Sequence, residues 1–248
     1  MKIISLNTWG GRAGLPLLQN FFKKNNDVDI FCLQEIWQTS DESVIENRDP
    51  RIVGQLLQEI AACLPKFNFY FRPQYRGIYG LATFIRKTIP VNSEGEVFVF
   101  GEKNYENPTS MGNHGRNIQH VTISASQGPV TIINFHGLWN GAGKSDSADR
   151  ILQSQKIIDF ISTVQNQCVL LGDFNLTPDT ESFKILLASC PVDLIFDNKI
   201  KSTRSSFYPK PEKLADYVLT SKNIKTISFT VLNDEVSDHL ALFADLAV

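Results

Sequence analysis

The sequence lacks several features that would place it in a specialised class of protein. No apolar run approaches the ~20 residues that an α-helix needs to cross a membrane, so we expect no membrane span. The first seven residues, from Met1 to Asn7, lack the apolar centre of a signal peptide, and we therefore expect a cytoplasmic protein. Internal repeats and low-complexity segments are also missing, so we expect one domain over residues 1–248.

Cysteine and excess positive charge are scarce as well. The four cysteines stand far apart, at Cys32, Cys63, Cys168 and Cys190. This spacing predicts free, buried thiols of a reducing compartment and disfavours a disulfide framework or a zinc knuckle. The net charge of -2 excludes binding to nucleic acid through bulk positive charge, although a local basic patch stays compatible with it. With 42% apolar residues, the chain has the composition of a folded domain.

The order of apolar runs predicts an α/β fold with mixed sheets. In the first third, strands are expected at residues 2–6 and 28–33, and helices from Leu15 to Phe22 and from Asp49 to Leu64. Strands then follow in close succession at 67–71, 81–85, 97–100, 118–123 and 130–135. Further helices are expected at 151–164 and 181–187, and further strands at 169–171, 217–219, 227–232 and 240–246. About a dozen strands exceed what one open sheet usually holds, so we expect two packed sheets with helices outside.

One short stretch places two polar side chains at the end of a buried strand. Val169, Leu170 and Leu171 form an apolar run that ends at Gly172, and Asp173 and Asn175 follow. In an extended segment, residues two apart point to the same side, so both polar groups would face one small volume. Phe174 between them would turn into the core. An Asp/Asn turn is the ordinary alternative.

Polar side chains also stand where other predicted strands begin or end. They are Asn7, Glu35, His136, Asp216 and the pair Asp238 and His239. Each alone has an ordinary explanation, such as a turn or a cap. The set contains no Lys or Arg, and oxygen ligands with few thiols or histidines suit Mg²⁺, Mn²⁺ or Ca²⁺. Zinc is disfavoured, because neither a His-x-x-x-His motif nor a paired cysteine spacing occurs.

These motifs resemble, in their order along the chain, those of the endonuclease/exonuclease/phosphatase superfamily. The resemblance extends from Asn7 to His239 and is carried by Asn7-Thr8-Trp9, Leu33-Gln34-Glu35, His136, Gly172-Asp173-Phe174-Asn175, Asp216-Tyr217 and Ser237-Asp238-His239. It implies a DNase I-like, four-layered α/β sandwich, in which two packed mixed β-sheets are flanked by helices. The superfamily contains nucleases, inositol polyphosphate phosphatases and sphingomyelinases.

The resemblance also implies a role for each strand-end residue. Glu35 would be the main ligand of Mg²⁺, with Asn7 and Asp238 beside it. The cation would neutralise charge on the phosphate and stabilise the leaving oxygen. Mn²⁺ or Ca²⁺ could replace Mg²⁺ in such an oxygen site.

A second group of residues would carry the reaction itself. Asp173 would position or deprotonate the attacking water, and Asn175 would orient the water and the phosphate. His239 would contact a phosphate oxygen while Asp216 fixes its ring, and His136 would make a second phosphate contact. Direct in-line attack by water is expected, because phosphoryl transfer needs mainly positioning and charge stabilisation.

Substrate contacts are less clearly indicated. Arg116 is the candidate for a further phosphate contact, although an arginine at a strand start is commonly a solvated side chain. His114 and His120 are expected to be structural. The segment 101–116 is rich in Asn and Gly, and the segment 199–213 carries a run of cations, namely Lys199, Lys201, Arg204, Lys210 and Lys213.

The implied function is that of a Mg²⁺-dependent phosphodiesterase, with nucleic acid as the leading substrate. A phosphatase or lipid phosphodiesterase of the same superfamily, acting on inositol phosphates or sphingomyelin, is the nearest alternative. A catalytically inactive phosphate-binding module is the alternative from another class, and the intact set of strand-end residues disfavours it. Nothing in the sequence calls for an obligate protein partner.

Overall fold

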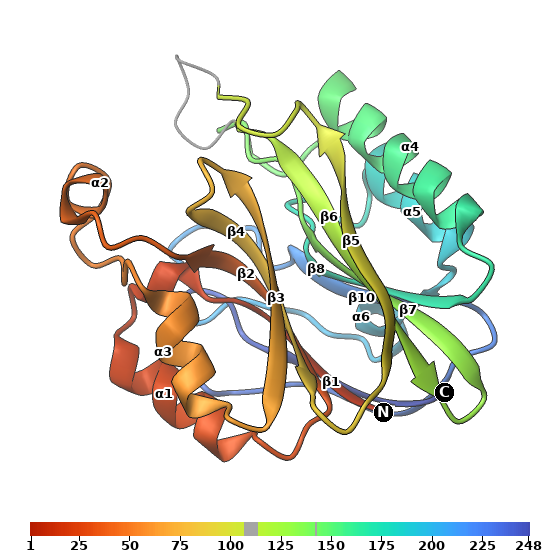
Figure 1. Ribbon diagram of the computed structural model, residues 1–248. Coiled ribbons are helices and arrows are strands. Elements are labelled where there is room, and N and C mark those ends of the chain that lie inside the picture. The colour runs from red at the N-terminus through yellow and green to blue at the C-terminus, as the bar shows by residue number, and fades with distance from the viewer. Residues whose placement is uncertain (107–113, 142) are drawn as a thin grey trace.

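Two six-stranded sheets face each other in the computed structural model, which describes residues 1–106, 114–141 and 143–248 (Figure 1). The first sheet runs in the order β11 (Lys225–Val231), β12 (Leu242–Ala247), β1 (Lys2–Asn7), β2 (Ile30–Trp37), β4 (Tyr79–Arg86) and β3 (Phe67–Tyr75). The second runs β5 (Val91–Phe100), β6 (Arg116–Ala125), β7 (Gly128–His136), β8 (Gln167–Asp173), β10 (Asp216–Thr220) and β9 (Val192–Asp193). The pairs β1–β2 and β7–β8 are parallel and the other pairs are antiparallel, so both sheets are mixed.

Helices cover the outer face of each sheet. On the first sheet lie α1 (Leu15–Lys24) and α3 (Leu56–Cys63), and on the second lie α4 (Ala148–Thr163) and α5 (Glu181–Ser189) (Figure 1). Three short helical segments, η1 (Trp9–Gly11), α2 (Glu42–Glu46) and α6 (Leu194–Asp197), lie in the connections. The predicted four-layered α/β sandwich of two packed mixed sheets flanked by helices is therefore confirmed.

The apolar pattern of the central strands explains the layering. On β1, Ile3 packs into the core that includes the second sheet, whereas Ile4 packs into the core under α1 and α3. On β2, Cys32 packs into the first of these cores and Phe31 into the second. Successive side chains of a strand point to opposite faces, and a strand covered on both faces needs an unbroken apolar run.

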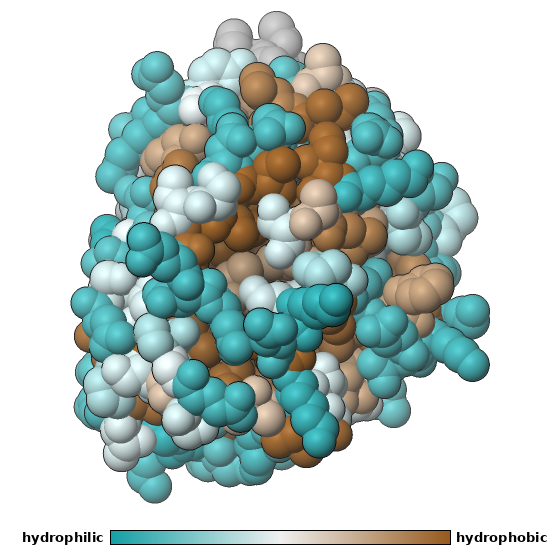
Figure 2. Space-filling view, turned by 90° about the vertical axis from the view of Figure 1, so that its right-hand side faces the viewer, coloured by the Kyte–Doolittle hydropathy of each residue, from teal (hydrophilic) through white to brown (hydrophobic). Residues whose placement is uncertain are grey.

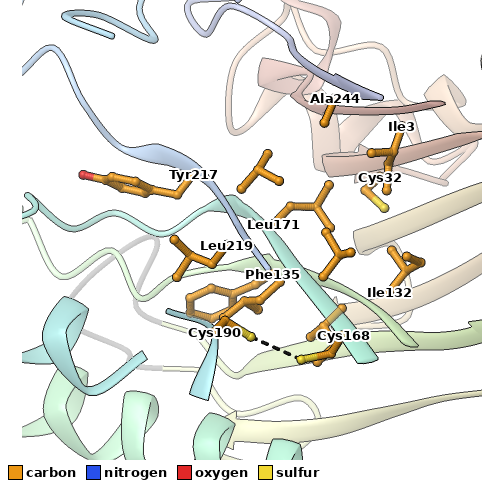
Figure 3. Packing of buried hydrophobic residues seen from close by; sticks show 14 of the residues in the cluster. Ile3, Cys32, Ile132, Phe135, Cys168, Leu171, Cys190, Tyr217, Leu219 and Ala244 are labelled. Carbon is orange, nitrogen blue, oxygen red and sulfur yellow. Dashed lines mark hydrogen bonds between the residues drawn. The ribbon is translucent and has the colours of Figure 1, made fainter. Parts of the chain in front are cut away.

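The larger core fills the space between the sheets and the space under α4 and α5. Ile3 and Cys32 approach Ile132 and Leu171 from the opposite sheet (Figure 3). At the outer end of this core, the Sγ atoms of Cys168 and Cys190 lie 3.2 Å apart (Figure 3). All four cysteines are free thiols, and three of them are buried, as the sequence predicts.

A polar bridge crosses between the sheets near the site end of the strands. Gln34 of β2 donates from Nε2 to Asn134 Oδ1 of β7 over 2.7 Å, and Thr83 of β4 donates to Gln119 Oε1 of β6 over 2.8 Å. The four side chains are buried and linked to one another through Asn134 Nδ2. Hydrogen bonds between these buried side chains fix the alignment of the two layers.

The structure corrects several predicted elements. The second strand does not stop at residue 33 but continues as β2 to Trp37. The helix expected from Asp49 to Leu64 begins only at Leu56, because turns and a bend precede it and the Gly54 carbonyl accepts a hydrogen bond from the Thr39 N–H over 2.8 Å. The short elements α2, α6 and β9 are not predicted. Residues 107–113 of the expected loop at 101–116 lie outside the described residues, and Arg116 at its end begins β6.

The face of the second sheet that carries α4 and α5 is mixed in character. Hydrophobic residues lie between hydrophilic ones there (Figure 2), and Ile151 and Leu152 of α4 are exposed.

Helices of the length and hydropathy needed for a membrane crossing are absent from the described residues.

Candidate active site

The polar strand ends of the two sheets meet at one edge of the sandwich. On the second sheet, His136, Asp173 and Asp216 stand side by side, because β7 pairs His136 with Asp173 and β10 pairs Asp216 with Asp173. On the first sheet, Asn7 ends β1 and donates from Nδ2 to Asp173 Oδ2 over 3.0 Å. The strand register therefore assembles the centre of the site from residues 166 positions apart.

Gly172 makes the exit of β8 possible. Its φ of 140° lies in the region that favours glycine, and a Cβ there would lie 1.9 Å from the carbonyl oxygen of Phe135. The next residue but one, Phe174, is buried against Phe135, Phe183 and Tyr217, as predicted. This apolar anchor fixes the backbone on either side of it.

Asp173 and Asn175 face the same pocket, as expected. The backbone between them is not extended, however. Asn175 has a φ of 52°, and its backbone N–H donates to Asp173 Oδ1 over 3.0 Å. The stretch is thus an Asx-type turn, and the expected extended geometry is wrong. Asn175 Nδ2 donates to the Gly137 carbonyl, which leaves Oδ1 directed toward Lys144 Nζ at 3.4 Å.

Glu35 reaches the pocket through an irregularity in β2. Its φ is 57°, and the pairing of β2 with β4 shifts register between Leu33 and Ile36. Thr8 supports this conformation, because its Oγ1 lies 2.9 Å from the Gln34 carbonyl and 3.2 Å from the Glu35 carbonyl. A left-handed conformation at a non-glycine residue is unfavourable and occurs often at functional sites.

His239 and Asp216 form a buried pair behind the pocket floor. Nδ1 of His239 lies 2.7 Å from Asp216 Oδ1, and Thr203 donates to the other oxygen of Asp216 over 2.7 Å. Nε2 of His239 then faces Asp173 Oδ2 at 3.4 Å. Burial and Arg204 lower the pKa of His239, but Asp216, Asp173 and Asp238 outweigh both and raise it above its ordinary value.

His136 is a neutral ring on the other side of Asp173. A guanidinium has only donors, so the 3.3 Å contact between Arg116 Nη1 and His136 Nδ1 makes Nδ1 an acceptor. The ring proton is then on Nε2, which lies 3.8 Å from Asp173 Oδ2. Burial and the charge of Arg116 lower the pKa of His136 to about 3. His136 can therefore donate a hydrogen bond into the pocket without adding charge.

Asp173 is the most strongly charge-stabilised carboxylate of the site. Burial alone would raise its pKa, but the charges of His239, Lys144 and Arg204 hold the pKa below its usual range. The side chain stays ionised and can accept a proton or a hydrogen bond from a water molecule. Its role as the group that positions the water therefore has a physical basis.

Oxygen donors suited to a divalent cation gather on the side of the first sheet. Glu35 and Asp238 both line the pocket, and burial together with the charge of Glu35 raises the pKa of Asp238. Asn7 lies beside them, with Nδ2 3.2 Å from Glu35 Oε1. A cation between the two carboxylates would relieve their repulsion, and the all-oxygen set fits Mg²⁺. The residues present thus fit the implied metal.

A second acidic group offers further ligand atoms. Among the described residues, ligand atoms of Asp173, Asp216 and His239 lie within 4.8 Å of one another. Both Asp216 oxygens and His239 Nδ1 already take part in hydrogen bonds, so this group serves as a hydrogen-bonded chain.

Cations approach the centre from the rest of the pocket. Arg204 contacts Nε2 of His239 and lies 3.5 Å from Asp238 Oδ2, and burial and Arg204 lower the pKa of the nearby Lys144. Arg116 is buried and lines the pocket, so the interpretation of it as a solvated side chain is wrong. Crowded cations of this kind repel one another, and a bound phosphate would offset the repulsion.

The pocket has a volume of about 400 Å³ and brings together most of the predicted residues. Glu35, His136, Asp173, Asn175, Asp238, His239 and Arg116 line it, while Asn7 and Asp216 lie directly behind through their hydrogen bonds. No predicted site residue lies elsewhere. This volume is in the range of sites for small ligands.

Further residues also line the pocket. They are Trp9, Arg12, Trp37, Arg48, Tyr75, Tyr79, His114, Trp139, Lys144 and Tyr208. The expectation that His114 is merely structural is therefore incomplete, since this buried ring lines the pocket. Of the cationic run before Asp216, Arg204 and Lys210 line the pocket, whereas Lys199 and Lys201 line a separate hollow beside α6.

Comparison with known families agrees with this geometry. The sequence model of the endonuclease/exonuclease/phosphatase family matches residues 4–239. Curated proteins gave no match to the chain.

Solved structures share the fold over the whole chain. A mannosyl-6-phosphatase from Bacteroides thetaiotaomicron VPI-5482 has 15% sequence identity and a TM-score of 0.74, with 100% of both chains covered. The catalytic domain of human Nocturnin, solved with a bound sulfate anion, has 15% identity and a TM-score of 0.65 and covers 99% of this chain and 92% of its own. TDP2 from Caenorhabditis elegans has 19% identity and a TM-score of 0.62, with 100% and 74% covered. At these identities the likeness shows the fold.

Proposed function

The chain belongs to the endonuclease/exonuclease/phosphatase family, whose members are hydrolases acting on phosphoester bonds, and we propose that it is a Mg²⁺-dependent phosphodiesterase. The observation that supports this best is the convergence of Asp173, the His239–Asp216 pair and the acids Glu35 and Asp238 on one pocket. These side chains form two separate sets. Glu35 and Asp238 are suited to bind a cation, whereas Asp173 and the His239–Asp216 pair are suited to bind a water molecule and a phosphate.

The proposed reaction is direct attack of water on phosphorus. Asp173 is held ionised, so it accepts a hydrogen bond from the water and then its proton. His136 donates to a phosphate oxygen from Nε2, and His239, on the other side of Asp173, contacts a second phosphate oxygen while Asp216 keeps its ring in place. Asn175 orients the water and phosphate, and Arg116 adds positive charge at His136. In-line geometry needs no covalent intermediate on the protein.

Glu35, Asn7 and Asp238 would hold the Mg²⁺, which supplies charge neutralisation at the phosphate and at the leaving oxygen. Mn²⁺ would suit the same oxygen donors.

Nucleic acid is the proposed substrate on the strength of the motif pattern, and a small phosphorylated compound is the second candidate. The pocket itself favours the second candidate in one respect, since its volume of about 400 Å³ and its aromatic walls suit a small ligand. The free thiols fit a reducing compartment, in line with the proposed cytoplasmic location.

A substrate panel in magnesium tests the proposal. We expect hydrolysis of bis(4-nitrophenyl) phosphate that disappears with EDTA and returns with magnesium. Abasic duplex, single-stranded DNA, RNA, inositol phosphates and sugar phosphates then rank the substrate classes. If no substrate of the panel is hydrolysed and magnesium does not shift the melting temperature, the inactive phosphate-binding module would be favoured.

A further inference from the structure

One wall of the pocket forms a compartment beside the proposed phosphate position. It is defined by Trp37, Arg48, Tyr75, Tyr79 and His114, and we refer to it as the aromatic compartment. The rings of Tyr75 and Tyr79 lie 5.6 Å and 5.3 Å from the ring of His114, so the three rings pack as one surface. The four aromatic and imidazole side chains are all buried. This wall is therefore a built surface rather than a set of loose surface groups.

Arg48 brings positive charge to this compartment. Its guanidinium lies 4.5 Å from the ring centre of Tyr75 and 5.6 Å from that of Trp37, so both rings hold it by cation–π contacts. Two other arginines of the pocket differ, since Arg12 pairs with Glu35 and Asp49, and Arg204 pairs with Asp238. In the part of the chain that the structure describes, Arg48 has no carboxylate partner. Stacking satisfies the face of a guanidinium but leaves its N–H edges available to a ligand.

His114 supplies a hydrogen-bond acceptor next to this cation. Its Nδ1 lies 2.9 Å from the carbonyl oxygen of Gly115, so Nδ1 carries a proton and donates it. Burial and the charge of Arg116 lower the pKa of the ring to about 2, so the ring is neutral. Nε2 then is an acceptor, and the described residues offer it no hydrogen-bond donor. A ligand hydroxyl would satisfy it.

The compartment is continuous with the reaction centre. Arg116 contacts His136 on one side, and its charge acts on His114 on the other. Both lie in the same cavity as Asp173 and His239. A substrate whose scissile phosphate lies at His136 and His239 would therefore extend past Arg116 toward Arg48.

We infer that Arg48, His114 and Tyr75 form a second anion subsite, which binds a phosphate or carboxylate one ring away from the scissile phosphate. The inference rests on the proposed function, because it assigns the scissile phosphate to the His136 and His239 side. The ring between the two anions packs on Tyr75 and Tyr79, and a hydroxyl on that ring donates to His114. Two sources share this chemistry, namely the neighbouring phosphate of an oligonucleotide and the second phosphate of a small sugar bisphosphate.

Binding of two matched phosphonates tests the subsite without requiring turnover, because their C–P bonds resist hydrolysis. In magnesium, 4-phosphonobenzoate carries a second anion across the ring, and phenylphosphonate lacks it. We expect calorimetry to show about tenfold tighter binding of 4-phosphonobenzoate to the wild type. Arg48→Gln should remove this preference, and Arg48→Lys should keep part of it because the charge remains.

Arg76→Gln is the matched control. Arg76 also stacks on Tyr75, at 5.2 Å, but it is exposed, pairs with Glu106 and lies outside the pocket lining. This variant should keep the tenfold preference. Equal binding of the two phosphonates to the wild type, or an undiminished preference in an Arg48→Gln protein with a normal melting temperature, would overturn the subsite.

Turnover then identifies the source of the second anion. One pair of substrates is fructose 1,6-bisphosphate and fructose 6-phosphate, and the other is thymidylyl-thymidine with and without a 5′-phosphate. We expect the second phosphate to lower KM about tenfold in one pair, and Arg48→Gln to raise that KM again while kcat changes little. Equal KM values in both pairs would contradict the subsite. If bis(4-nitrophenyl) phosphate is not hydrolysed, the proposed function is refuted instead. The phosphonate measurement distinguishes the two failures, because it records binding and needs no hydrolysis.

Discussion

His239 and Asp216 are joined by a contact of 2.7 Å between Nδ1 and Oδ1, although they lie 23 positions apart. Asp216 begins β10, and His239 stands in the connection before β12, so each sheet is tied to the reacting centre through this pair. The contact fixes which nitrogen of His239 faces Asp173. The orientation of the ring therefore depends on a residue that does not line the pocket.

Asp216→Asn should lower kcat by roughly 100-fold to 10,000-fold, because the ring loses a charged partner and its preferred orientation. Steady-state rates with bis(4-nitrophenyl) phosphate measure the loss. Thr203→Val removes only the hydrogen bond to the other oxygen of Asp216 and serves as the control, with a much smaller expected loss. A near-normal kcat for Asp216→Asn would remove this pair from the mechanism.

Asp173→Ala should lower kcat by about 1,000-fold or more without abolishing substrate binding, because the carboxylate acts mainly in the transition state. His239→Ala should behave similarly. Circular dichroism and melting temperature establish that each variant is folded. Turnover close to that of the parent would show that the residue has no part in activating water or stabilising the phosphate.

Glu35→Gln should raise the magnesium concentration needed for half-maximal activity by about tenfold or more, because it removes the main charged ligand. Glu94→Gln is the control, since Glu94 pairs with Arg72 outside the pocket. A magnesium titration of initial rates distinguishes the variants. If both match the parent, Glu35 is not the main ligand.

The buried His114 should make the fold sensitive to acid. Its pKa is about 2 in the folded state and about 6.5 in an unfolded chain. Between these values the unfolded chain binds the extra proton, so the stabilising contribution is complete above pH ~6.5 and declines as the pH falls. His114→Gln should reduce the slope of unfolding free energy by up to roughly 1.4 kcal/mol per pH unit between pH 6 and 4. Urea unfolding at a series of pH values measures it, and an unchanged slope would show that His114 is not buried as a neutral ring.

Gly172→Ala should destabilise the fold by about 3 kcal/mol or more, because its Cβ would overlap the Phe135 carbonyl. Gly128→Ala is a matched control. Gly128 also has a positive φ, of 115°, but a Cβ there meets nothing within 4 Å, so only backbone strain of about 1 kcal/mol is expected. Similar losses of unfolding free energy for the two variants would show that the close approach of β7 and β8 is not rigid.

The strand ends of the site could be predicted because their signal is local. An apolar run shows where β8 is buried, and the polar residue that ends it, Asp173, must stand at the sheet edge. The same reasoning holds for Asn7 and His136. Their convergence was implied by the family resemblance, and the register of β7, β8 and β10 agrees with it.

The cations and aromatic walls could not be predicted in the same way. Arg204 contacts His239 over 35 positions, and Lys144 reaches Asn175 over 31 positions, from connections without any periodic pattern. The left-handed φ of Glu35 also leaves no trace in composition, because glutamate rarely adopts it and only the shifted register of β2 reveals it. Contacts of this kind depend on the folded path of the loops.

The groups proposed for catalysis and those proposed for substrate selection occupy different parts of the chain. The groups proposed to hydrolyse the ester stand at strand termini, whereas Arg48 and Lys210 come from connections between regular elements. Exchange of the short segment around Arg48 for one of different charge would therefore redirect the enzyme to other compounds while its reaction chemistry is inherited intact. The two sheets would keep the proposed catalytic groups in place while the connecting segments are replaced. Redesign of the substrate preference would therefore start at residues 38–55.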